Sequence, residues 1–442
     1  MSYWATSTQG LNRPYGVVIV GNYIYIANSS GSTISKISLT NPTTDFNTNI
    51  QPSNIYNPYA LAVNKSNNLI YYTTNGNQIR KTDNTAFVTL NNYIYDMKID
   101  NTNTYLYAVC SANVICKISL SNPSGDINQS WATNASQGVN NAKSIVIDRT
   151  NTYIYMLNVG TNSVGRISLT NPTTNYNYLW ATPSGMNNPI ALAMDSTNTY
   201  MYVVNNGNNT IIQLSMATPT NNLIFATATA GLFNPAGIVI DASNIYMYVS
   251  NQTGGGNSLG TISQISLSPS CFLAGTKILT DEGYIQIQHL RKGDLIQTLC
   301  HGLVPIDVIG FKQISHLAKK ERVKDQLYNY STTIKTPELF EDLILTGCHS
   351  VLVDEFTSPE QREKTLQILG DIYVTDDKYR LPACLDEENA KVFETPGEYT
   401  IYHFALENAD YYMNYGVFAN GLLVESSSKR YMKECSQMTL MP

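Results

Sequence analysis

The sequence predicts an all-β chain of two domains that meet near residue 270. Three observations predict this class: short alternating or apolar runs between Asn, Gly, Thr and Pro, a repeat that ends near residue 270, and a change of composition there. Residues 1–270 hold 10 Lys and Arg, 8 Asp and no Glu, whereas the remaining 172 residues hold 17 Lys and Arg, 25 Asp and Glu, and all five histidines. We therefore expect domains at 1–270 and 271–442, each large enough for its own core.

The first domain is built from a repeat of roughly 37 to 47 residues. The six units begin at Arg13, Asn57, about Ile94, Asn141, Asn188 and Asn234. A complete unit contains four strand-like runs, such as IALAMD, TYMYVVN, NTIIQLSM and NLIFATA, with no helical pattern between them. Four strands per unit at this repeat length are typical of propeller blades. The sequence predicts a six-bladed β-propeller.

The two ends of the repeat indicate how the ring closes. Fourth strands carry a Trp-Ala-Thr or Phe-Ala-Thr signature at Trp131, Trp180 and Phe225. The last unit stops after its third strand, whereas the chain begins with the same signature at Trp4. We expect the N-terminal segment to supply the missing fourth strand, because an open ring would expose a sheet edge.

Recurrent tyrosines and aspartates in the repeat have structural explanations. Tyr-x-Tyr pairs, such as Tyr153 and Tyr155, place two rings on one strand face, where we expect packing between blades. Asp148, Asp195 and Asp241 end first strands, where Asx turns are expected. The units resemble NHL and YVTN β-propellers, since YVVNNGNNTI is close to the YVTN motif. That resemblance implies a fold and not a function. We expect the propeller to bind a protein or glycan ligand that the sequence does not identify, and we expect it to hold no metal and no cofactor.

The second domain opens with CFLAGTKILTDEGYIQIQHLRKGDLIQT, which starts at Cys271. The segment begins with a cysteine, which is followed by a small-residue turn that ends in Gly275-Thr276. Gly293-Asp294 comes about twenty residues later. This order and spacing resemble the first block of the Hint domain, which hedgehog autoprocessing domains and inteins share. The resemblance implies a horseshoe-like all-β fold with minor helices.

The second block of the Hint family is Thr-x-x-His, and LILTGCHSVLV contains Thr346 and His349 at that spacing. Residues three apart on a strand do not share a face, so we expect a local turn that aims both at Cys271. The segment YTIYHFALENADYYMNYGVFANGLLVESS resembles the last block of the Hint family, which is a pair of C-terminal strands. In this comparison His403 stands where inteins often carry Asp or Cys. His403 is either a second imidazole that assists proton transfer or a structural histidine.

The last block also departs from the intein pattern. Inteins end this block with His-Asn and then Cys, Ser or Thr, because the terminal Asn must cyclise. Here Glu425 and Ser426 stand at those positions, and Asn420 precedes the final strand as part of an Asn-Gly hairpin turn. The departure disfavours protein splicing.

The resemblance implies a self-processing reaction at the Ser270–Cys271 bond. Cys271 would attack the Ser270 carbonyl and form a thioester by N-to-S acyl shift, assisted by Thr346 and His349. Only 18 residues follow Val424, too few for a sterol-recognition module, so the acyl acceptor is expected to be water, a thiol or another nucleophile. Cys348 and Cys435 are either internal relays or ordinary thiols. The alternative is an inactive Hint domain on a binding or scaffold propeller.

The remaining features indicate class and location. No basic run suggests nucleic-acid binding, and no signal peptide or membrane span is recognisable, so we expect a soluble chain, intracellular at synthesis. The Asn-, Ile- and Tyr-rich composition and the propeller–Hint fusion resemble predicted giant-virus proteins, which implies host cytoplasm or virion. Cys110 and Cys116 flank a hairpin turn, either facing each other or as two free thiols. Segments 315–327 and 357–369 have helical character, the second with Ser358 as its N-cap.

Overall fold

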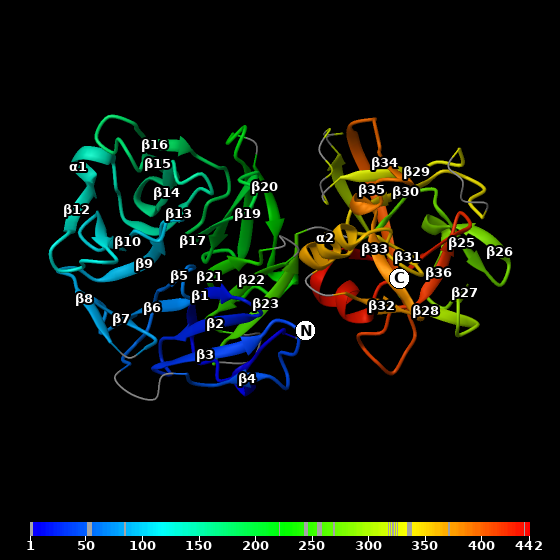
Figure 1. Ribbon diagram of the computed structural model, residues 1–442, viewed down its shortest axis with the longest axis horizontal. Helices are drawn as coiled ribbons and strands as arrows, with labels where there is room; N and C mark the ends of the chain where they lie inside the picture. Colours follow the sequence, from blue (N-terminus) through cyan, green and yellow to red (C-terminus); the bar gives the residue numbers. More distant parts are fainter. Residues whose placement is uncertain are drawn as a thin grey trace. The chain divides into compact units, whose positions relative to one another are not determined.

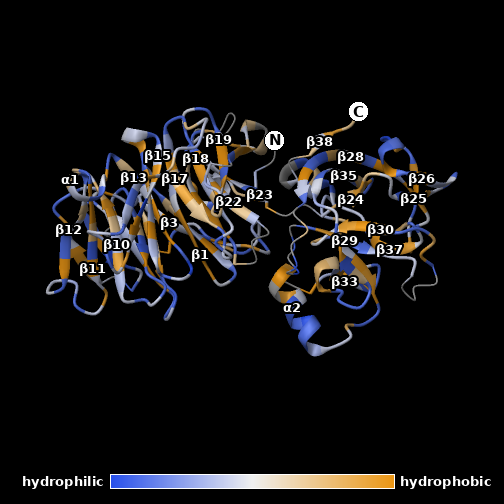
Figure 2. Cartoon of the chain, turned by 90° about the horizontal axis from the view of Figure 1, so that it is seen from above, coloured by the Kyte–Doolittle hydropathy of each residue, from blue (hydrophilic) through white to orange (hydrophobic). Residues whose placement is uncertain are grey.

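The computed structural model contains two compact units, shown in Figure 1. It describes residues 3–50, 55–83, 85–220, 222–242, 246–253, 259–267, 270–316, 318, 320, 322, 324, 326–333, 338–369, 372–436 and 438–442. One unit holds Met1–Ala242 with Met247–Gln264, and the other holds Ser243–Tyr246 with Ile265–Pro442. In both units the hydrophobic residues follow the strands, whereas the connecting loops are largely hydrophilic (Figure 2).

The first unit is a six-bladed β-propeller of antiparallel sheets. Five blades have four strands each: β1 (Pro14–Val20), β2 (Tyr23–Asn28), β3 (Thr33–Ser38) and β4 (Phe46–Asn47); β5 (Leu61–Asn64), β6 (Leu69–Thr74), β7 (Gln78–Lys81) and β8 (Ala86–Thr89); β9 (Ile94–Ile99), β10 (Tyr105–Cys110), β11 (Val114–Ser119) and β12 (Ile127–Thr133); β13 (Ala142–Ile147), β14 (Tyr153–Asn158), β15 (Ser163–Ser168) and β16 (Tyr176–Ala181); β17 (Pro189–Met194), β18 (Tyr200–Asn205), β19 (Thr210–Ser215) and β20 (Asn222–Ala226). The sixth sheet has β21 (Pro235–Ile240), β22 (Tyr246–Asn251) and β23 (Thr261–Ser266). Short helices lie at Ser7–Gln9, Asn134–Gln137 (α1), Val159–Thr161 and Ala228–Ala230.

The N-terminal segment completes the sixth blade, as predicted. Ala5 forms a β-bridge with Ile262 in β23, and the Ile262 N–H donates to the Ala5 carbonyl at 2.9 Å. The Trp4 ring meets Tyr248 edge-on at 4.9 Å between centroids, the same distance as in the pair of Trp180 and Tyr155. The closure rests on this bridge rather than on a full strand, yet it reproduces the ring contact of the other blades.

The repeated aromatic rings pack between blades, which confirms the structural interpretation of the Tyr-x-Tyr pairs. Tyr107 and Trp131 of the third blade share one buried cluster with Ile145 and Ile154 of the fourth. The two rings lie 5.1 Å apart in an edge-to-face arrangement. Such pairs add about 0.5–1.5 kcal/mol to the free energy of burial.

The aspartates hold turns where the structure describes them, but through the N–H four residues on and not through the N–H two residues on that the predicted Asx turn would use. The Asp148 carboxylate accepts the backbone N–H of Thr152 at 2.7 Å, and Asp195 accepts that of Thr199 at 2.7 Å. The turn after Asp241 includes residues 243–245, which lie outside the described residues. These aspartates therefore hold the hairpins between first and second strands.

Cys110 and Cys116 face each other across the β10–β11 hairpin. Both thiols are buried and free, with the two sulfurs 3.5 Å apart. A disulfide needs about 2.05 Å between the sulfurs, so this pair consists of two contacting thiols.

Glycine is required where inner strands of adjacent blades approach each other. A Cβ on Gly237 in β21 would lie 2.2 Å from the Tyr15 carbonyl oxygen in β1. The Ser250 hydroxyl donates to the same oxygen at 2.6 Å, so that carbonyl is held in place. Gly237→Ala is expected to destabilise the propeller by about 1–3 kcal/mol, because overpacking forces a backbone shift.

Thermal unfolding of the full chain, followed by calorimetry, measures this effect. A matched control is Gly31→Ala, whose Cβ would meet side-chain atoms no closer than 3.2 Å. Equal melting temperatures for Gly237→Ala and wild type would contradict the predicted clash.

The second unit is a mainly β domain with one longer helix. Its strands are β24 (Phe272–Leu273), β25 (Lys277–Thr280), β26 (Gly283–Gln286), β27 (Leu295–Gln297), β28 (Leu303–His316), β29 (Leu327–Tyr330), β30 (Leu343–Thr346), β31 (Ser350–Val353), β32 (Val374–Thr375), β33 (Lys378–Pro382), β34 (Ala390–Val392), β35 (Gly397–Leu406), β36 (Gly416–Ala419), β37 (Leu422–Glu425) and β38 (Thr439–Leu440). Short helices lie at Ile287–His289, Ala383–Leu385 and Tyr431–Cys435, and α2 spans Pro359–Leu369. The longest strands, β28 and β35, pair antiparallel along most of their length and support the short strands β24 and β38. A buried cluster that includes Phe272, Tyr328 and Phe404 forms the core.

One of the two predicted helices is present. Ser358 caps α2, since its hydroxyl accepts the backbone N–H of Gln361 at 3.1 Å and Pro359 is the first helical residue. The segment 315–327 differs from the prediction at its ends, because Ser315 and His316 belong to β28 and Leu327 opens β29. Both ends pair with neighbouring strands, so sheet hydrogen bonds outweigh the helical character of the charged residues. Residues 317, 319, 321, 323 and 325 lie outside the described residues.

Candidate functional site

Cys271 lies directly before β24, a two-residue strand inserted between β30 and β35. Phe272 pairs with Leu345 of β30 and with Tyr402 of β35. Continued by one residue, this antiparallel register sets Cys271 opposite Thr346 on one side and opposite His403 on the other. The sheet therefore brings together three predicted site residues that are far apart in the sequence.

Thr346 makes direct hydrogen bonds to the backbone of Cys271. Its hydroxyl oxygen accepts the Cys271 N–H at 2.8 Å, and its own N–H donates to the Cys271 carbonyl at 3.0 Å. Both residues are buried, with 0% of Cys271 and 2% of Thr346 exposed. Thr346 therefore holds the nitrogen of the Ser270–Cys271 peptide bond.

A turn after β30 brings His349 back toward Thr346, as predicted. The His349 N–H donates to the Thr346 carbonyl at 2.9 Å, so the turn spans Gly347 and Cys348. A Cβ on Gly347 would lie 2.7 Å from the Lys324 carbonyl oxygen and 2.8 Å from its Cα. Glycine is needed at this position because the backbone of another segment passes so close.

His349 is a fully buried histidine without the usual hydrogen bonds. Among the described residues neither of its ring nitrogens makes a hydrogen bond of good geometry, and only the backbone of Glu425 and of Cys271 lies close enough to act on the ring. Its ring centroid lies 4.3 Å from that of Phe272. Burial lowers the pKa of His349 to about 3, and the nearby backbone of Glu425 and of Cys271 only partly opposes this effect. The imidazole is therefore neutral at neutral pH, and a buried polar group that is so poorly hydrogen-bonded calls for an explanation.

His403 is a second buried imidazole beside the first. The two ring centroids are 5.0 Å apart, and His403 is 1% exposed. Burial and the neighbouring His349 hold the pKa of His403 well below its usual range. Its Nδ1 has no hydrogen-bond partner among the described residues. The structure brings His403 to the site but does not decide between its two predicted roles.

The Cys271 thiol sits in an apolar environment. It belongs to a buried cluster with Val308, Ile401, Met432 and Met438. Burial raises the pKa of the Cys271 thiol, and the positive charge of Lys312 partly opposes this effect. The resting thiol is therefore protonated, and a base is needed to produce the thiolate.

The C-terminal segment contributes contacts that the sequence did not reveal. The Tyr431 hydroxyl accepts the Ser270 N–H at 3.1 Å, on the other side of the bond that Thr346 contacts. Thr439 and Leu440 extend the sheet along Phe311 and Gly310 of β28. Met432 and Met438 of this segment pack in the same buried cluster as Cys271. No motif marks the segment, because the contacts depend on how the last 12 residues fold back on β28.

The positions that distinguish this chain from inteins have structural partners. The buried Glu425 carboxylate lies 3.0 Å from Arg380 and accepts the Ser350 N–H at 3.2 Å. Burial raises the pKa of Glu425, and Arg380 acts in the opposite direction. Asn420 has a positive φ of 48° in the turn between β36 and β37, and its side chain bonds the backbone of Lys277 and Asp342. Asn420 is thus the hairpin residue that the Asn-Gly pattern predicts.

The other cysteines and possible ligands lie elsewhere. Cys348 is buried next to Cys384. Burial raises the pKa of the Cys384 thiol, and the neighbouring Cys348 raises it further. The side chain of Cys435 lies outside the described residues. Among the described residues, no group of three or more His, Cys, Asp or Glu side chains is arranged to hold a metal ion. No helix in the described ranges is both long and apolar enough to cross a membrane.

The buried histidines predict acid sensitivity of the second unit. An unfolded histidine titrates near pH 6.5, whereas folded His349 titrates near pH 3, so the unfolded state binds more protons between these values. Stability is therefore lost as the pH falls from 6.5 toward 3, by up to about 1.4 kcal/mol per pH unit for one histidine. His403 acts in the same direction, and the raised pKa of Glu425 acts in the opposite direction.

Comparing variants isolates the histidine contribution. Hydrogen exchange of peptides from β35 in urea gives the free energy of unfolding of the second unit between pH 7.5 and 5. This free energy is expected to depend less steeply on pH in His349→Gln than in wild type. His301→Gln is the control, because His301 is partly exposed and pairs with Asp376 at 3.0 Å. The prediction is wrong if His349→Gln retains the wild-type slope.

The comparisons with known proteins agree with this geometry. The Hint domain family matches residues 270–366, which include Cys271, Thr346 and His349. No curated protein matches the chain at a significant level. The family match covers neither His403 nor the propeller, so the NHL and YVTN resemblance and the giant-virus resemblance stay predictions.

Solved structures resemble the propeller at low identity. Hydrazine synthase of Kuenenia stuttgartiensis is 14% identical, with a TM-score of 0.38, over 58% of this chain and 96% of that one. The Cps50 (Swd1) β-propeller domain of Myceliophteria thermophila is 8% identical, with a TM-score of 0.39, over 56% and 95%. A protein of unknown function from Bacteroides thetaiotaomicron is 12% identical, with a TM-score of 0.44, over 58% and 70%. At these scores the likenesses say nothing about function.

The strand register around Cys271, the Thr346 hydrogen bonds and the family match all concern the same segment. The chain is a six-bladed β-propeller followed by a Hint domain in its C-terminal region.

Proposed function

We propose that the Hint domain cleaves its own chain at the Ser270–Cys271 bond and releases the propeller. The observation that carries this proposal is the pair of hydrogen bonds between Thr346 and the backbone of Cys271, beside the poorly hydrogen-bonded ring of His349. The proposal sets the functional domain boundary at the same bond, between 1–270 and 271–442.

The first step moves one proton and exchanges two bonds. The Cys271 sulfur attacks the Ser270 carbonyl carbon, a C–S bond forms, and the C–N bond of the peptide breaks. The thiol proton passes through neutral His349 to the departing nitrogen in one concerted transfer, because an imidazole with so low a pKa is a weak base on its own, and no external proton is consumed. A pKa lowered to about 3 makes the protonated ring a strong acid, and this suits it to protonate a poor leaving group.

Thr346 has a positioning role in this step. Its hydroxyl oxygen accepts the Cys271 N–H at 2.8 Å and thereby fixes the orientation of the scissile nitrogen. Tyr431 fixes the preceding peptide through the Ser270 N–H. The bond is held from both sides, and this lowers the entropic cost of reaching the attacking geometry.

The second step transfers the Ser270 acyl group from sulfur to water, a thiol or another nucleophile. Met432 and Met438 belong to the same buried cluster as Cys271, so the acceptor would reach the thioester only if the C-terminal segment moves. A released propeller would keep its closed ring, because Trp4 and Ala5 already complete the sixth blade. It would then be free to bind a ligand in the host cell or virion.

A second candidate is an inactive Hint domain on a binding or scaffold propeller. The complete burial of Cys271 favours it, because a resting site without solvent access is also what an unused core cysteine would show.

The intact mass of the freshly purified chain, followed over time with and without dithiothreitol, separates the two candidates. The proposal expects fragments that end at Ser270 and begin at Cys271, formed faster with thiol. Hydroxylamine should trap the propeller fragment as a hydroxamate, because it attacks thioesters. A chain that stays whole in all three conditions supports the inactive alternative.

A further inference from the structure

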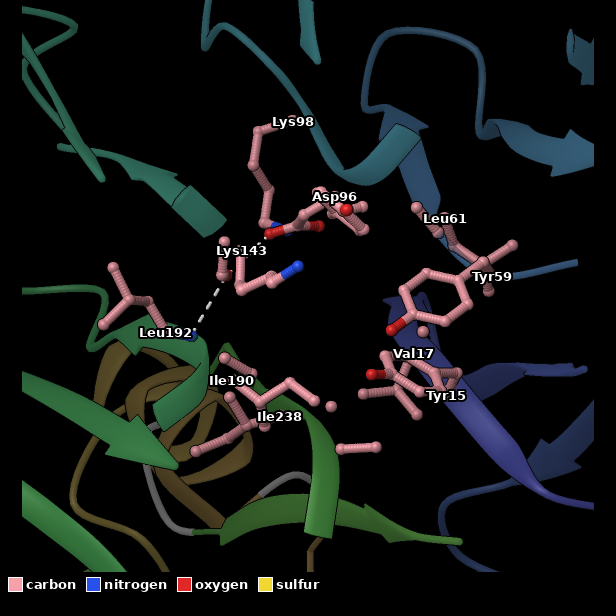
Figure 3. Close-up of a pocket in the computed structure, with 17 residues that line it drawn as sticks. Tyr15, Val17, Tyr59, Leu61, Asp96, Lys98, Lys143, Ile190, Leu192 and Ile238 are labelled. Carbon is pink, nitrogen blue, oxygen red and sulfur yellow. Dashed lines mark hydrogen bonds and ion pairs between the residues drawn. The ribbon is translucent and has the colours of Figure 1, made fainter. Parts of the chain in front are cut away.

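A pocket lies at the centre of the propeller, lined by the innermost strands of all six blades (Figure 3). Its empty volume is about 470 Å³, part of which is open to solvent. One equivalent position per blade faces it, occupied by Tyr15, Tyr59, Tyr95, Lys143, Ile190 and Ala236.

β-bulges place four of these six side chains. In the fourth blade Ala142 pairs with Asn158 and Ser144 pairs with Leu157, so Lys143 is the extra residue. The same one-residue shift occurs at Tyr95, Ile190 and Ala236. A bulge redirects the side chain of its extra residue, and bulges are frequent beside binding sites.

We call the six pocket-facing positions Tyr15, Tyr59, Tyr95, Lys143, Ile190 and Ala236 the bulge layer. The residue type in this layer varies among the blades, whereas the residue type in a neighbouring layer does not. Two residues further along, every inner strand carries an aliphatic or Met side chain: Val17, Leu61, Met97, Ile145, Leu192 and Ile238. A uniform apolar layer is sufficient to pack the ring. The variation in the bulge layer therefore calls for another explanation than packing.

The bulge layer contributes a positive charge that the pocket does not neutralise. Asp96 is fully engaged, with Lys98 at 2.7 Å on one oxygen and the Ser144 hydroxyl at 2.7 Å on the other. Lys143 lies over the Tyr95 ring, 3.5 Å from its centroid. Within the described ranges no carboxylate pairs with Lys143. One cation therefore remains for an incoming anion.

The two sides of the pocket differ in chemistry. The ring centroids of Tyr15 and Tyr59 lie 3.5 Å apart. Burial raises the pKa of Tyr15 to about 12, so its hydroxyl remains a donor at neutral pH. On the opposite side lie Ile190, Leu192 and Ile238, whereas on the tyrosine side the aliphatic residues Val17 and Leu61 lie beside the two rings. Figure 3 shows the Lys143 amine directed toward the space between these two sides.

We propose that the pocket binds a small monocarboxylate with an apolar body. The carboxylate would accept hydrogen bonds from Lys143 and a tyrosine hydroxyl, and the apolar body would lie against Ile190 and Ile238. A neutral polyol fits less well, because the aliphatic side would leave its hydroxyls without partners. A metal ion fits less well, because both oxygens of Asp96 are occupied.

Titration of the full chain with benzoate, measured by saturation-transfer NMR, tests this site. Benzoate is expected to bind saturably, with affinity that falls as salt is added. Benzamide has the same shape without the charge and is expected to bind at least about tenfold more weakly. Lys143→Met should weaken benzoate binding by about tenfold or more, and Lys143→Arg should largely restore it.

The control variant is Lys36→Met. Lys36 lies 3.7 Å over the Tyr23 ring, the same kind of contact as that of Lys143, but it is not part of the pocket lining. It should bind benzoate like wild type. The proposal is overturned if benzoate does not bind, if benzamide binds equally well, or if Lys143→Met leaves the affinity unchanged. Because Lys143 lies in the propeller, the result does not depend on cleavage at Ser270.

Discussion

Cys271→Ala is expected to abolish cleavage completely. The sulfur is the only atom that can form the thioester, and the alanine side chain has no nucleophile to replace it. The substitution is small in a buried position, so the chain should fold, and its intact mass should remain that of the uncut protein with and without thiol. Wild type under the same conditions should convert to the two fragments.

Cys384→Ala is the matched control for this experiment. Cys384 is equally buried in the same unit, and burial raises its pKa as it does for Cys271. This variant should cleave like wild type, which excludes a general effect of removing a core thiol. Cys348→Ala should behave the same way if Cys348 is an ordinary thiol, whereas a loss of the second step alone would identify it as a relay. Cleavage that persists in Cys271→Ala would refute the thioester mechanism.

His349→Gln is expected to slow cleavage by about 10²–10⁴-fold, the usual contribution of a positioned acid–base group. Glutamine approximates the volume of the imidazole and can donate a hydrogen bond, but it cannot carry the proton from sulfur to nitrogen. Because the pKa of His349 is lowered to about 3, wild-type cleavage at saturating hydroxylamine should not show the decline near pH 6.5 that an ordinary histidine base would cause.

Two histidine variants make this result specific. His301→Gln alters an exposed ring paired with Asp376 and should leave the rate unchanged. His403→Gln decides between the two roles left open for that residue. A slower rate with unchanged stability would show that His403 assists proton transfer, and a lower stability with an unchanged rate would show that it is structural. A wild-type rate in His349→Gln would contradict the proton transfer proposed for it.

Much of the propeller could be predicted from sequence because its signals are local. A blade is a single stretch of chain, so alternating residues, turn residues and the repeat length all report on contacts between neighbours in sequence. The closure by Trp4 was also predictable, because the repeat supplies a template against which a displaced fourth strand is recognised. The pocket was not predictable, since one-residue bulges at Tyr95 and Lys143 decide which side chains face the centre.

The Hint site was predictable only in part. Cys271, Thr346 and His349 belong to short motifs with fixed spacing, so the chain itself brings them to notice. The helix expected at 315–327 was wrong at its ends, because pairing of β28 and β29 with neighbouring strands outweighs local helical preference.

The sequence alone therefore predicted the two folds and the candidate residues Cys271, Thr346, His349 and His403, because each of these is encoded in a repeat or a short motif. Only the tertiary structure decided the environment of those residues. The register of β24 sets His403 beside Cys271, the last residues fold back to place Tyr431 on Ser270, and burial makes both imidazoles neutral. These features arise from contacts between segments up to 161 residues apart. Desolvation and register depend on the whole packed unit, so no local pattern records them.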